Sequence, residues 1–169
     1  MTQSHDPGAL RCAGTDDLPH VMAALRALAQ DLGDPFNASQ PRVEAALFGP
    51  GAYAFAILAQ EANAPLGIAL CHPIFSTFQG TTCTYVSDLW VAPKARGQGL
   101  GQALLAKAAT EGAARWHSQA LRLTVYADNA PAIAFYHRLG FEIRTSDQAA
   151  ALRGVALDAL VAGARCGFK

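Results

Sequence analysis

The chain has 169 residues, the length of one ordinary domain, and its 51% of apolar residues is enough to build a sizeable core. Its 13 basic and 13 acidic residues balance, which argues against non-specific nucleic-acid binding, and no apolar run approaches the roughly 20 residues that span a bilayer. We therefore expect a single domain over residues 1–169, a cytoplasmic location, and neither nucleic acid nor membrane as a partner.

The N-terminal half predicts two helices followed by three antiparallel strands. Thr15-Asp16-Asp17 supplies N-cap chemistry for a helix whose apolar residues recur at helical spacing, and Gly33-Asp34-Pro35 ends it. Ser39 can begin a second, short helix with Pro41 in its first turn. Turn residues then separate apolar runs that are typical of strands. The predicted elements are helices over about 17–31 and 39–48 and strands over 52–59, 66–75 and 82–91.

The C-terminal half predicts alternating helices and strands. A glycine-rich turn opens a long helix that lasts to about His117, and an apolar run follows it as a strand. Because this run is apolar on both faces, we expect it at the centre of the sheet. Asp128 or Asn129 caps a short helix that ends at Leu139. The strands predicted in this half cover residues 120–126, 141–145 and about 154–160.

Four cysteines stand far apart in the chain. They form no C-x-x-C pair, and no histidine lies beside them at metal-ligand spacing. We therefore predict reduced, buried thiols, rather than a disulfide or a metal site, at Cys12, Cys71, Cys83 and Cys166.

The segment 86–105 predicts a phosphate-binding loop. Alternating glycines let the backbone turn tightly and approach a ligand, and the first turn of the following helix carries unpaired N–H groups that attract anions. Arg96 adds a permanent charge and a planar set of donors suited to phosphate. A dinucleotide fingerprint would need a glycine at Gln102 or Leu104, and a Walker loop would need Lys-Ser/Thr after Gly101, so neither pattern fits.

What remains is R-x-x-G-x-G after a strand that ends in V-x-P, and it resembles the pyrophosphate motif of the GNAT family of N-acetyltransferases. A second segment, 129–142, looks like the family's later helix, which carries Asn and Tyr before a Leu-Gly-Phe exit. The resemblance implies the GNAT fold: an α/β (α+β) architecture with a mixed, mostly antiparallel sheet of about six to seven strands, flanked by about four helices.

The resemblance also implies acetyl-coenzyme A as co-substrate, with no metal. In the family, the strand before the loop bulges, and its backbone groups bind the pantetheine amide and the acetyl carbonyl. Asn129 resembles an asparagine near the pantetheine, although a helix N-cap explains it equally well. The expected cofactor-binding residues are Leu89, Trp90, Val91, Arg96, Gly97, Gln98, Gly99, Leu100, Gly101, Asn129 and Tyr136.

Two positions are candidates for proton transfer. Tyr136 matches the family tyrosine that faces the coenzyme sulfur and would protonate the departing thiolate; ordinary packing beside Phe135 is the alternative. An amine with a pKa of about 10 must also lose a proton. The segment 75–91 resembles the diamine and polyamine acetyltransferase branch, which has Glu-Asp where this chain has Ser87-Asp88. Asp88 becomes the candidate base, or a structural hydrogen-bonding residue.

Other polar residues have weaker claims to the site. Ser87 or Tyr85 could orient a water instead of a direct base. Acidic residues of the first helices and hairpins could attract a cationic amine, although an isolated surface carboxylate is usually just solvated. The acidic candidates are Asp31, Asp34 and Glu61; Trp90 suits core packing better than an acceptor pocket, and His72 and His137 suit structural or surface roles better than catalysis.

The predicted function is transfer of acetyl from acetyl-coenzyme A to a primary amine of a small molecule, such as a polyamine, a diamine or an amino acid, by direct attack. Two alternatives stay open. A non-catalytic acyl-coenzyme A sensor would explain why Ser87 replaces the glutamate, and a protein or peptide N-acetyltransferase would differ only in its acceptor. Because the polyamine branch commonly pairs, the resemblance also implies a homodimer.

Overall fold

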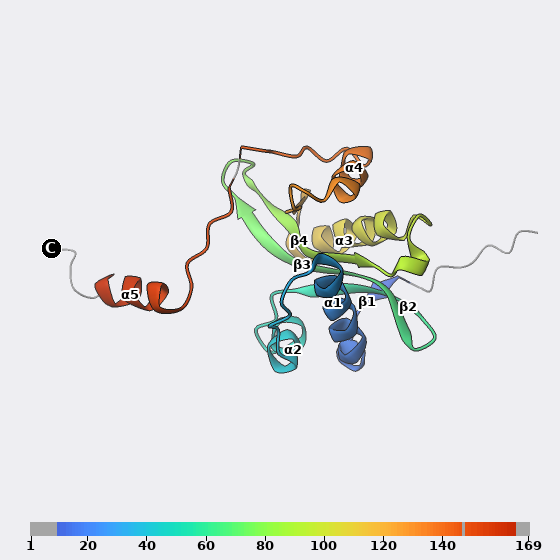
Figure 1. The fold of residues 1–169 in the computed structure, drawn as a ribbon, viewed down its shortest axis with the longest axis horizontal. Coiled ribbons are helices and arrows are strands. Elements are labelled where there is room, and N and C mark those ends of the chain that lie inside the picture. Colours follow the sequence, from blue (N-terminus) through green and yellow to red (C-terminus); the bar gives the residue numbers. More distant parts are fainter. Residues whose placement is uncertain (1–9, 147, 165–169) are drawn as a thin grey trace, which may run out of the picture. The chain divides into compact units, whose positions relative to one another are not determined.

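The computed structural model describes residues 10–146 and 148–164. These residues belong to two compact units, Met1–Tyr126 and Ala127–Lys169. The first unit holds the sheet and three α-helices, and the second holds two α-helices (Figure 1). The single domain inferred from length stays a prediction.

The sheet of the first unit is mixed and mostly antiparallel, as predicted. Its order is β1-β2-β3-β4-β5. The first four strands, labelled in Figure 1, are antiparallel neighbours, and β5 pairs in parallel with β4. The strands are β1 (Arg11–Cys12), β2 (Phe55–Glu61), β3 (Ala64–Ser76), β4 (Thr81–Val91) and β5 (Ala120–Leu123). Within the described residues the sheet therefore has five strands, fewer than the six to seven expected.

The expected central position of β5 is wrong. This strand is the last in the sheet order and spans four residues, none of them fully buried. The polar side chains of Arg122 and Thr124 alternate with apolar ones, which is the pattern of a strand with one solvated face. Apolar content alone overstated the burial of this segment.

Two layers of helix cover the sheet of the first unit (Figure 1). Alternate residues of β3 face opposite layers: Gly67 lies against Leu104 of the long helix, while Ile68 joins a core cluster with Val21 and Leu25. Burying each large apolar side chain in that cluster stabilises the fold by about 1.5–3 kcal/mol. The helices are α1 (Leu18–Leu32) and α2 (Gln40–Phe48) on one side and α3 (Leu100–Trp116) on the other.

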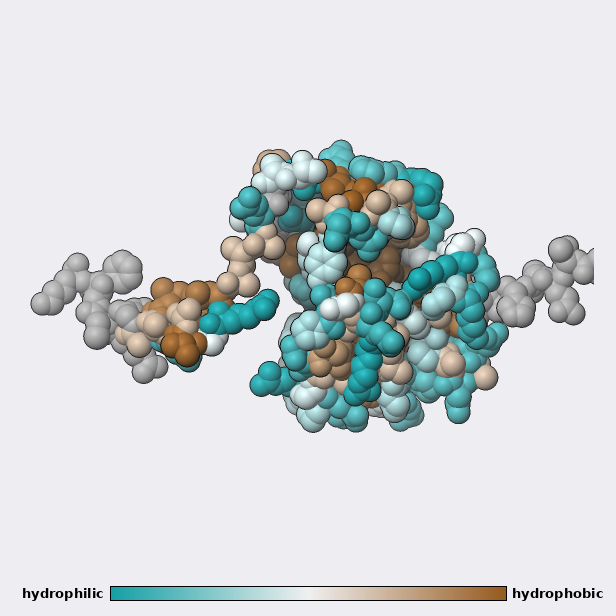
Figure 2. Space-filling view, in the orientation of Figure 1, coloured by the Kyte–Doolittle hydropathy of each residue, from teal (hydrophilic) through white to brown (hydrophobic). Residues whose placement is uncertain are grey.

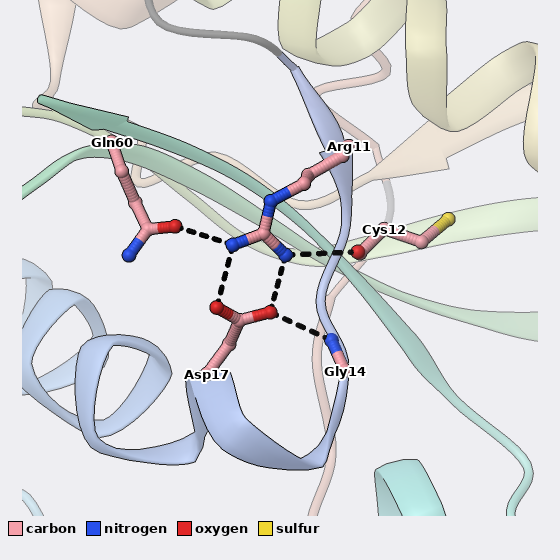
Figure 3. Close-up of polar contacts among 5 residues, drawn as sticks. All are labelled: Arg11, Cys12, Gly14, Asp17 and Gln60. Carbon is pink, nitrogen blue, oxygen red and sulfur yellow. Dashed lines mark hydrogen bonds and ion pairs between the residues drawn. The ribbon is translucent and has the colours of Figure 1, made fainter.

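The start of α1 is attached to the edge of the sheet by a charged cluster (Figure 3). The Arg11 guanidinium makes two hydrogen bonds with the Asp17 carboxylate, and its Nη2 also donates to Gln60 Oε1 at 2.6 Å. Asp17 accepts a further hydrogen bond from the Gly14 N–H at 2.8 Å. The hydrogen bond from Arg11 is the main reason that the pKa of Asp17 falls to about 2.

Neither of the two strands expected in the second unit is present in its described residues. Residues 141–144 form no regular structure, and 154–160 lie in a helix. The helices are α4 (Ala130–Arg138) and α5 (Gly154–Ala164). The last segment is rich in alanine and leucine, which favour helix when no neighbouring strand pairs with them. None of the described helices is long and apolar enough to cross a membrane.

The apolar side chains of α5 face solvent. Val155 is 84% exposed and Leu160 is 61% exposed, and Figure 2 shows the helix as a largely brown, apolar segment. A helix this rich in apolar residues is ordinarily buried, so exposure on this scale departs from the usual pattern.

Three of the four cysteines fall within the described residues, and all three are free thiols, as predicted. Cys71 and Cys83 are buried and Cys12 is half-buried. Burial raises the pKa of Cys71 to about 12, so this thiol stays protonated. Cys166 lies outside the described residues.

Candidate active site

The glycine loop connects the end of β4 to the start of α3. A short 3-10 turn (Pro93–Ala95) follows β4, and Gly97 and Gly99 then take the left-handed conformation, with φ of 75° and 82°. This conformation costs other residue types about 1–2 kcal/mol, so both positions favour glycine. Gly99 is the N-cap of α3. The loop therefore exposes the free N–H groups of a long helix at an open surface.

The sheet holds the first turns of α3 firmly. A Cβ built on Gly67 of β3 would lie 2.9 Å from Leu104 Cδ1 and 3.3 Å from Leu100 Cδ2, so the helix packs directly on the strand. Farther along α3, a Cβ on Gly112 would lie only 1.8 Å from Thr84 Oγ1. These two close approaches fix the direction of α3 and hence the position of the loop.

β4 carries a bulge where the resemblance implied one. Asp88 pairs with Leu70 and Val86 pairs with Cys71, so Ser87 has no opposite residue. The register with β5 ends at Val86, well before β4 itself ends. Beyond the bulge, one side of β4 has therefore lost its neighbouring strand.

Hydrogen-bond alternation shows which backbone groups lie on this open side. The Ala92 N–H donates to the Leu66 carbonyl at 2.8 Å, so Ala92, and Trp90 two residues earlier, direct their backbone groups to β3. The backbone groups of Leu89 and Val91 consequently point the other way. The Val91 carbonyl accepts a hydrogen bond from Arg96 Nε at 2.9 Å, so the groups left for a ligand along this edge are the Leu89 backbone and the Val91 N–H. The backbone of Trp90 is paired with β3.

Arg96, Gly97, Gln98 and Gly99 are all exposed at the loop. Nothing lies within 4 Å of a Cβ built on either glycine, so ligand atoms have room there. Gln98 closes the loop by donating from Nε2 to the Lys94 carbonyl at 2.9 Å. Exposed amides, a helix N-terminus and an arginine together fit a pyrophosphate group.

A pocket of about 270 Å³ lies between α1, α2 and the sheet. Its walls are mostly apolar, and Asp34, Asn37 and Asp88 are its polar members apart from backbone groups. The lining side chains come from α1, the connection to α2, α2 itself, β3 and β4, and include Leu25, Leu28, Leu32, Phe36, Val43 and Leu70. The pocket thus brings an apolar cavity against the bulge of β4.

Asp88 is half-buried at the sheet end of this pocket. Burial raises its pKa above the ordinary 3.8, while Ser87 and the charge of His72 lower it in part. Ser87 is exposed, and its Oγ donates to the Leu70 carbonyl at 3.2 Å. A carboxylate with a raised pKa beside an apolar cavity is suited to accepting a proton.

His72 and Tyr85 form a ring pair beside Asp88. They are register partners on β3 and β4, and their ring centroids lie 5.0 Å apart. The Tyr85 hydroxyl also lies 2.7 Å from Thr124 Oγ1. The sequence favoured a structural or surface role for His72. The register that places His72 beside Asp88 depends on which residue forms the bulge, and the sequence does not show that.

The three acidic candidates all have partners. Asp31 Oδ2 accepts hydrogen bonds from the Trp90 indole, at 3.0 Å, and from Arg96. Asp34 accepts one from the Tyr126 hydroxyl at 2.7 Å, and Glu61 forms an ion pair with Lys94. Of these carboxylates, Asp34 is the one that lines the pocket.

Asn129 and Tyr136 lie in the second unit. Asn129 Oδ1 accepts from the Ala132 N–H at 3.2 Å, which confirms that Asn129 caps α4. Tyr136 is buried, with ring contacts to Phe135 and Phe141, and burial raises its pKa. His137 is exposed. The cofactor contacts of Asn129 and Tyr136 stay predictions.

A mixed sheet with a bulged strand that leads into a glycine loop is the architecture that the two sequence motifs led us to expect. Residues 22–141 match the family model of the Acetyltransferase (GNAT) family, and the chain belongs to this family. The resemblance inferred from the two sequence motifs is thereby confirmed.

Curated relatives and solved structures agree with this assignment. A thialysine N-epsilon-acetyltransferase of Sus scrofa is 30% identical over 141 residues, which cover 78% of this chain and 82% of the relative. An integron cassette protein from the mobile metagenome of V. cholerae is 25% identical, with a TM-score of 0.71 over 90% of this chain and 96% of that one. An aminoglycoside acetyltransferase from a soil metagenomic sample, in complex with sisomicin, has the same TM-score at 13% identity over 86% of this chain and 96% of that one, which shows the shared fold alone.

Proposed function

We propose that this protein transfers the acetyl group of acetyl-coenzyme A to the primary amine of a small molecule. The observation that carries the proposal is the arrangement along β4. This strand holds a carboxylate at an apolar pocket, Asp88, then an open backbone edge at Leu89 and Val91, and then the glycine loop. An acceptor site, a thioester site and a phosphate site thus follow each other along one strand.

Acetyl-coenzyme A, when bound, supplies an activated acetyl thioester. We assign the pyrophosphate to Arg96 and the amides of 97–101, and the pantetheine to the open edge of β4. A backbone N–H of Leu89 or Val91 would donate to the acetyl carbonyl oxygen. Such a preorganised donor stabilises developing negative charge by about 3 kcal/mol.

The acceptor amine would enter the apolar pocket. Asp88 takes the proton from its ammonium group, and the raised pKa of Asp88 makes it a better proton acceptor than an ordinary carboxylate. Asp34, at the same pocket, attracts the cationic acceptor. The apolar walls suit the alkyl part of an amine. A diamine, a polyamine or an amino-acid side chain has this chemistry, and the Sus scrofa relative is named for thialysine.

Tyr136 is proposed as the acid that protonates the departing thiolate. A tyrosine hydroxyl is protonated at neutral pH, as a general acid must be, and burial, which raises the pKa of Tyr136, keeps it so. Asn129 would reach the pantetheine region from the start of α4.

One observation favours a second candidate, a non-catalytic acyl-coenzyme A sensor. Where the polyamine branch has glutamate, this chain has Ser87, whose hydroxyl is hydrogen-bonded to the Leu70 carbonyl. A sensor would keep the glycine loop and lack turnover.

The deciding experiment is thiol release from acetyl-coenzyme A with a panel of acceptors. The panel holds diamines, polyamines, thialysine, amino acids, an aminoglycoside and short peptides. We expect turnover with small primary amines. Binding of acetyl-coenzyme A without turnover on any acceptor would favour the sensor, and turnover on peptides alone would favour a peptide N-acetyltransferase. Light scattering on the same sample measures whether the chain forms the homodimer that the resemblance implies.

A further inference from the structure

Asp31 connects the pocket helix to the glycine loop. It lies one residue before the end of α1, and its Oδ2 accepts hydrogen bonds from Trp90 Nε1 at 3.0 Å and from Arg96 Nη2. These partners lie 59 and 65 residues away in the sequence. The contact is therefore a product of folding, and catalysis as proposed above does not use it.

The Trp90 contact gives Asp31 a rigid support. Trp90 is 8% exposed and belongs to the core cluster that includes Val21 and Leu25 of α1. A buried indole N–H needs an acceptor, and Asp31 supplies it. Because the ring is fixed by packing, the carboxylate that binds it is held in a defined place.

Arg96 is held from two directions. Its Nε donates to the Val91 carbonyl at 2.9 Å, and its Nη2 donates to Asp31. These bonds use two of the five N–H donors of a guanidinium. The Arg96 side chain is still 53% exposed, so the remaining donors are open to a ligand.

We propose that Asp31 is a positioning residue for phosphate binding: by fixing Arg96 between α1 and the end of β4, it holds the guanidinium ready for the pyrophosphate of coenzyme A. The inference rests on the proposed function, because it takes the glycine loop as the coenzyme site. A free arginine side chain loses rotamer entropy when a ligand immobilises it, and Asp31 meets part of that cost before the ligand arrives.

Whether a substitution of Asp31 weakens or tightens binding of coenzyme A distinguishes a positioning role from a simple electrostatic one. Removing a negative charge next to an anion site should tighten binding of a polyanion. Removing a positioning carboxylate should weaken it. Asp31→Ala tests both effects in one measurement, and calorimetric titration with coenzyme A gives the readout without turnover.

We expect Asp31→Ala to weaken coenzyme A about 10-fold, equivalent to about 1.4 kcal/mol. Asp31→Glu, which keeps the charge and both possible hydrogen bonds, should recover part of the affinity. Asp16→Ala is the matched control, since it removes the same charge from an exposed aspartate of the 3-10 turn before α1 and should change nothing. Circular dichroism melts show that each variant is folded.

A double-mutant cycle with Arg96→Ala completes the test. If Asp31 acts through Arg96, the double variant binds coenzyme A no more weakly than Arg96→Ala alone. Additive losses, or unchanged or tighter binding by Asp31→Ala, overturn the proposal. Wild-type protein that does not bind coenzyme A, or Arg96→Ala that binds it normally, overturns the coenzyme assignment and the proposal with it. If Arg96→Ala weakens binding of coenzyme A and Asp31→Ala leaves it unchanged, the positioning role of Asp31 is overturned, whereas the coenzyme assignment stands.

Discussion

The glycine loop and the pocket belong to the same compact unit but are built in opposite ways. The loop is one uninterrupted stretch, 92–101, and it offers backbone amides at the start of a helix. The pocket gathers side chains from α1, the connection to α2, α2 itself, β3 and β4. A ligand that binds to backbone amides needs positions without a side chain, such as glycines. A ligand that binds to side chains needs particular residues that folding brings together.

This difference separates the binding of the coenzyme from the binding of the acceptor in the proposed reaction. A backbone site suits a ligand that every member of a family shares, because side chains around it can change without loss. A side-chain site suits an acceptor that differs between members, because single substitutions alter it. Substitutions in the loop should therefore affect the coenzyme, and substitutions in the pocket should affect the acceptor or the proton transfer.

The largest effect is expected at Asp88. Asp88→Asn keeps the shape of the side chain but removes the base, so kcat should fall by about 100-fold or more while coenzyme A still binds. Wild-type activity should rise with pH as Asp88 loses its proton. Because burial raises the pKa of Asp88 above 3.8, this rise lies at higher pH than it would for an ordinary aspartate. A pH profile of the variant that keeps the same rise would remove Asp88 from the mechanism.

A smaller effect is expected in the loop. Gly99→Ala forces a side chain into a backbone conformation with φ of 82°, at a cost of about 1–2 kcal/mol. We expect the KM for acetyl-coenzyme A to rise about 10-fold with little change in the KM for the amine. Gly80→Ala is the matched control, because Gly80 also has a positive φ, of 67°, and lies in an open turn outside the site. Equal changes in both KM values would contradict the separation of the two regions.

Asp34 should have a weaker influence, confined to the acceptor. Asp34→Asn removes one exposed negative charge at the pocket, so the KM for a diamine should rise about 3-fold and the KM for acetyl-coenzyme A should stay constant. Tyr126→Phe removes the hydrogen-bonding hydroxyl but keeps the carboxylate, and its acceptor KM should change less. For an uncharged amine acceptor, the KM of Asp34→Asn should equal that of the wild type.

Asp17 should affect stability and neither KM. Its carboxylate, with a pKa of about 2 against an ordinary 3.8, stabilises the folded state above about pH 4, and this contribution is lost as pH falls through 2. Asp17→Asn should lower the free energy of unfolding by about 1–2 kcal/mol at pH 7. Urea unfolding at several pH values should show the gap to wild type closing in acid. A constant gap would mean that the ion pair with Arg11 is not its source.

Sequence and structure agree best where the signal is local. Gly97 and Gly99 predict a tight loop before a helix, and both adopt the left-handed conformation that only glycine takes easily. Gly33 likewise ends α1, also with a positive φ of 73°. The N-cap role of Asn129 was one of two interpretations, and its hydrogen bond to the Ala132 N–H bears that one out.

Agreement is poorest where burial or pairing partners decide. Residues 154–160 are apolar enough for a strand, yet they form helix, because a strand needs a neighbour and a helix satisfies its own backbone. The run after α3 is an edge strand, although its composition predicted a central one. In both segments the sequence shows how apolar the residues are. Whether those residues pair with a strand or become buried depends on the tertiary structure.

By itself the sequence determined the glycine loop, the order of the elements from α1 to β5 and the family, because these follow from residues that are neighbours in the chain. Tertiary structure alone decided that Ser87 forms the bulge, that Asp88 lies at an apolar pocket beside His72, and that Asp31 binds both Trp90 and Arg96. These contacts join residues many positions apart, and a one-residue shift of strand register would turn each side chain to the other face of the sheet.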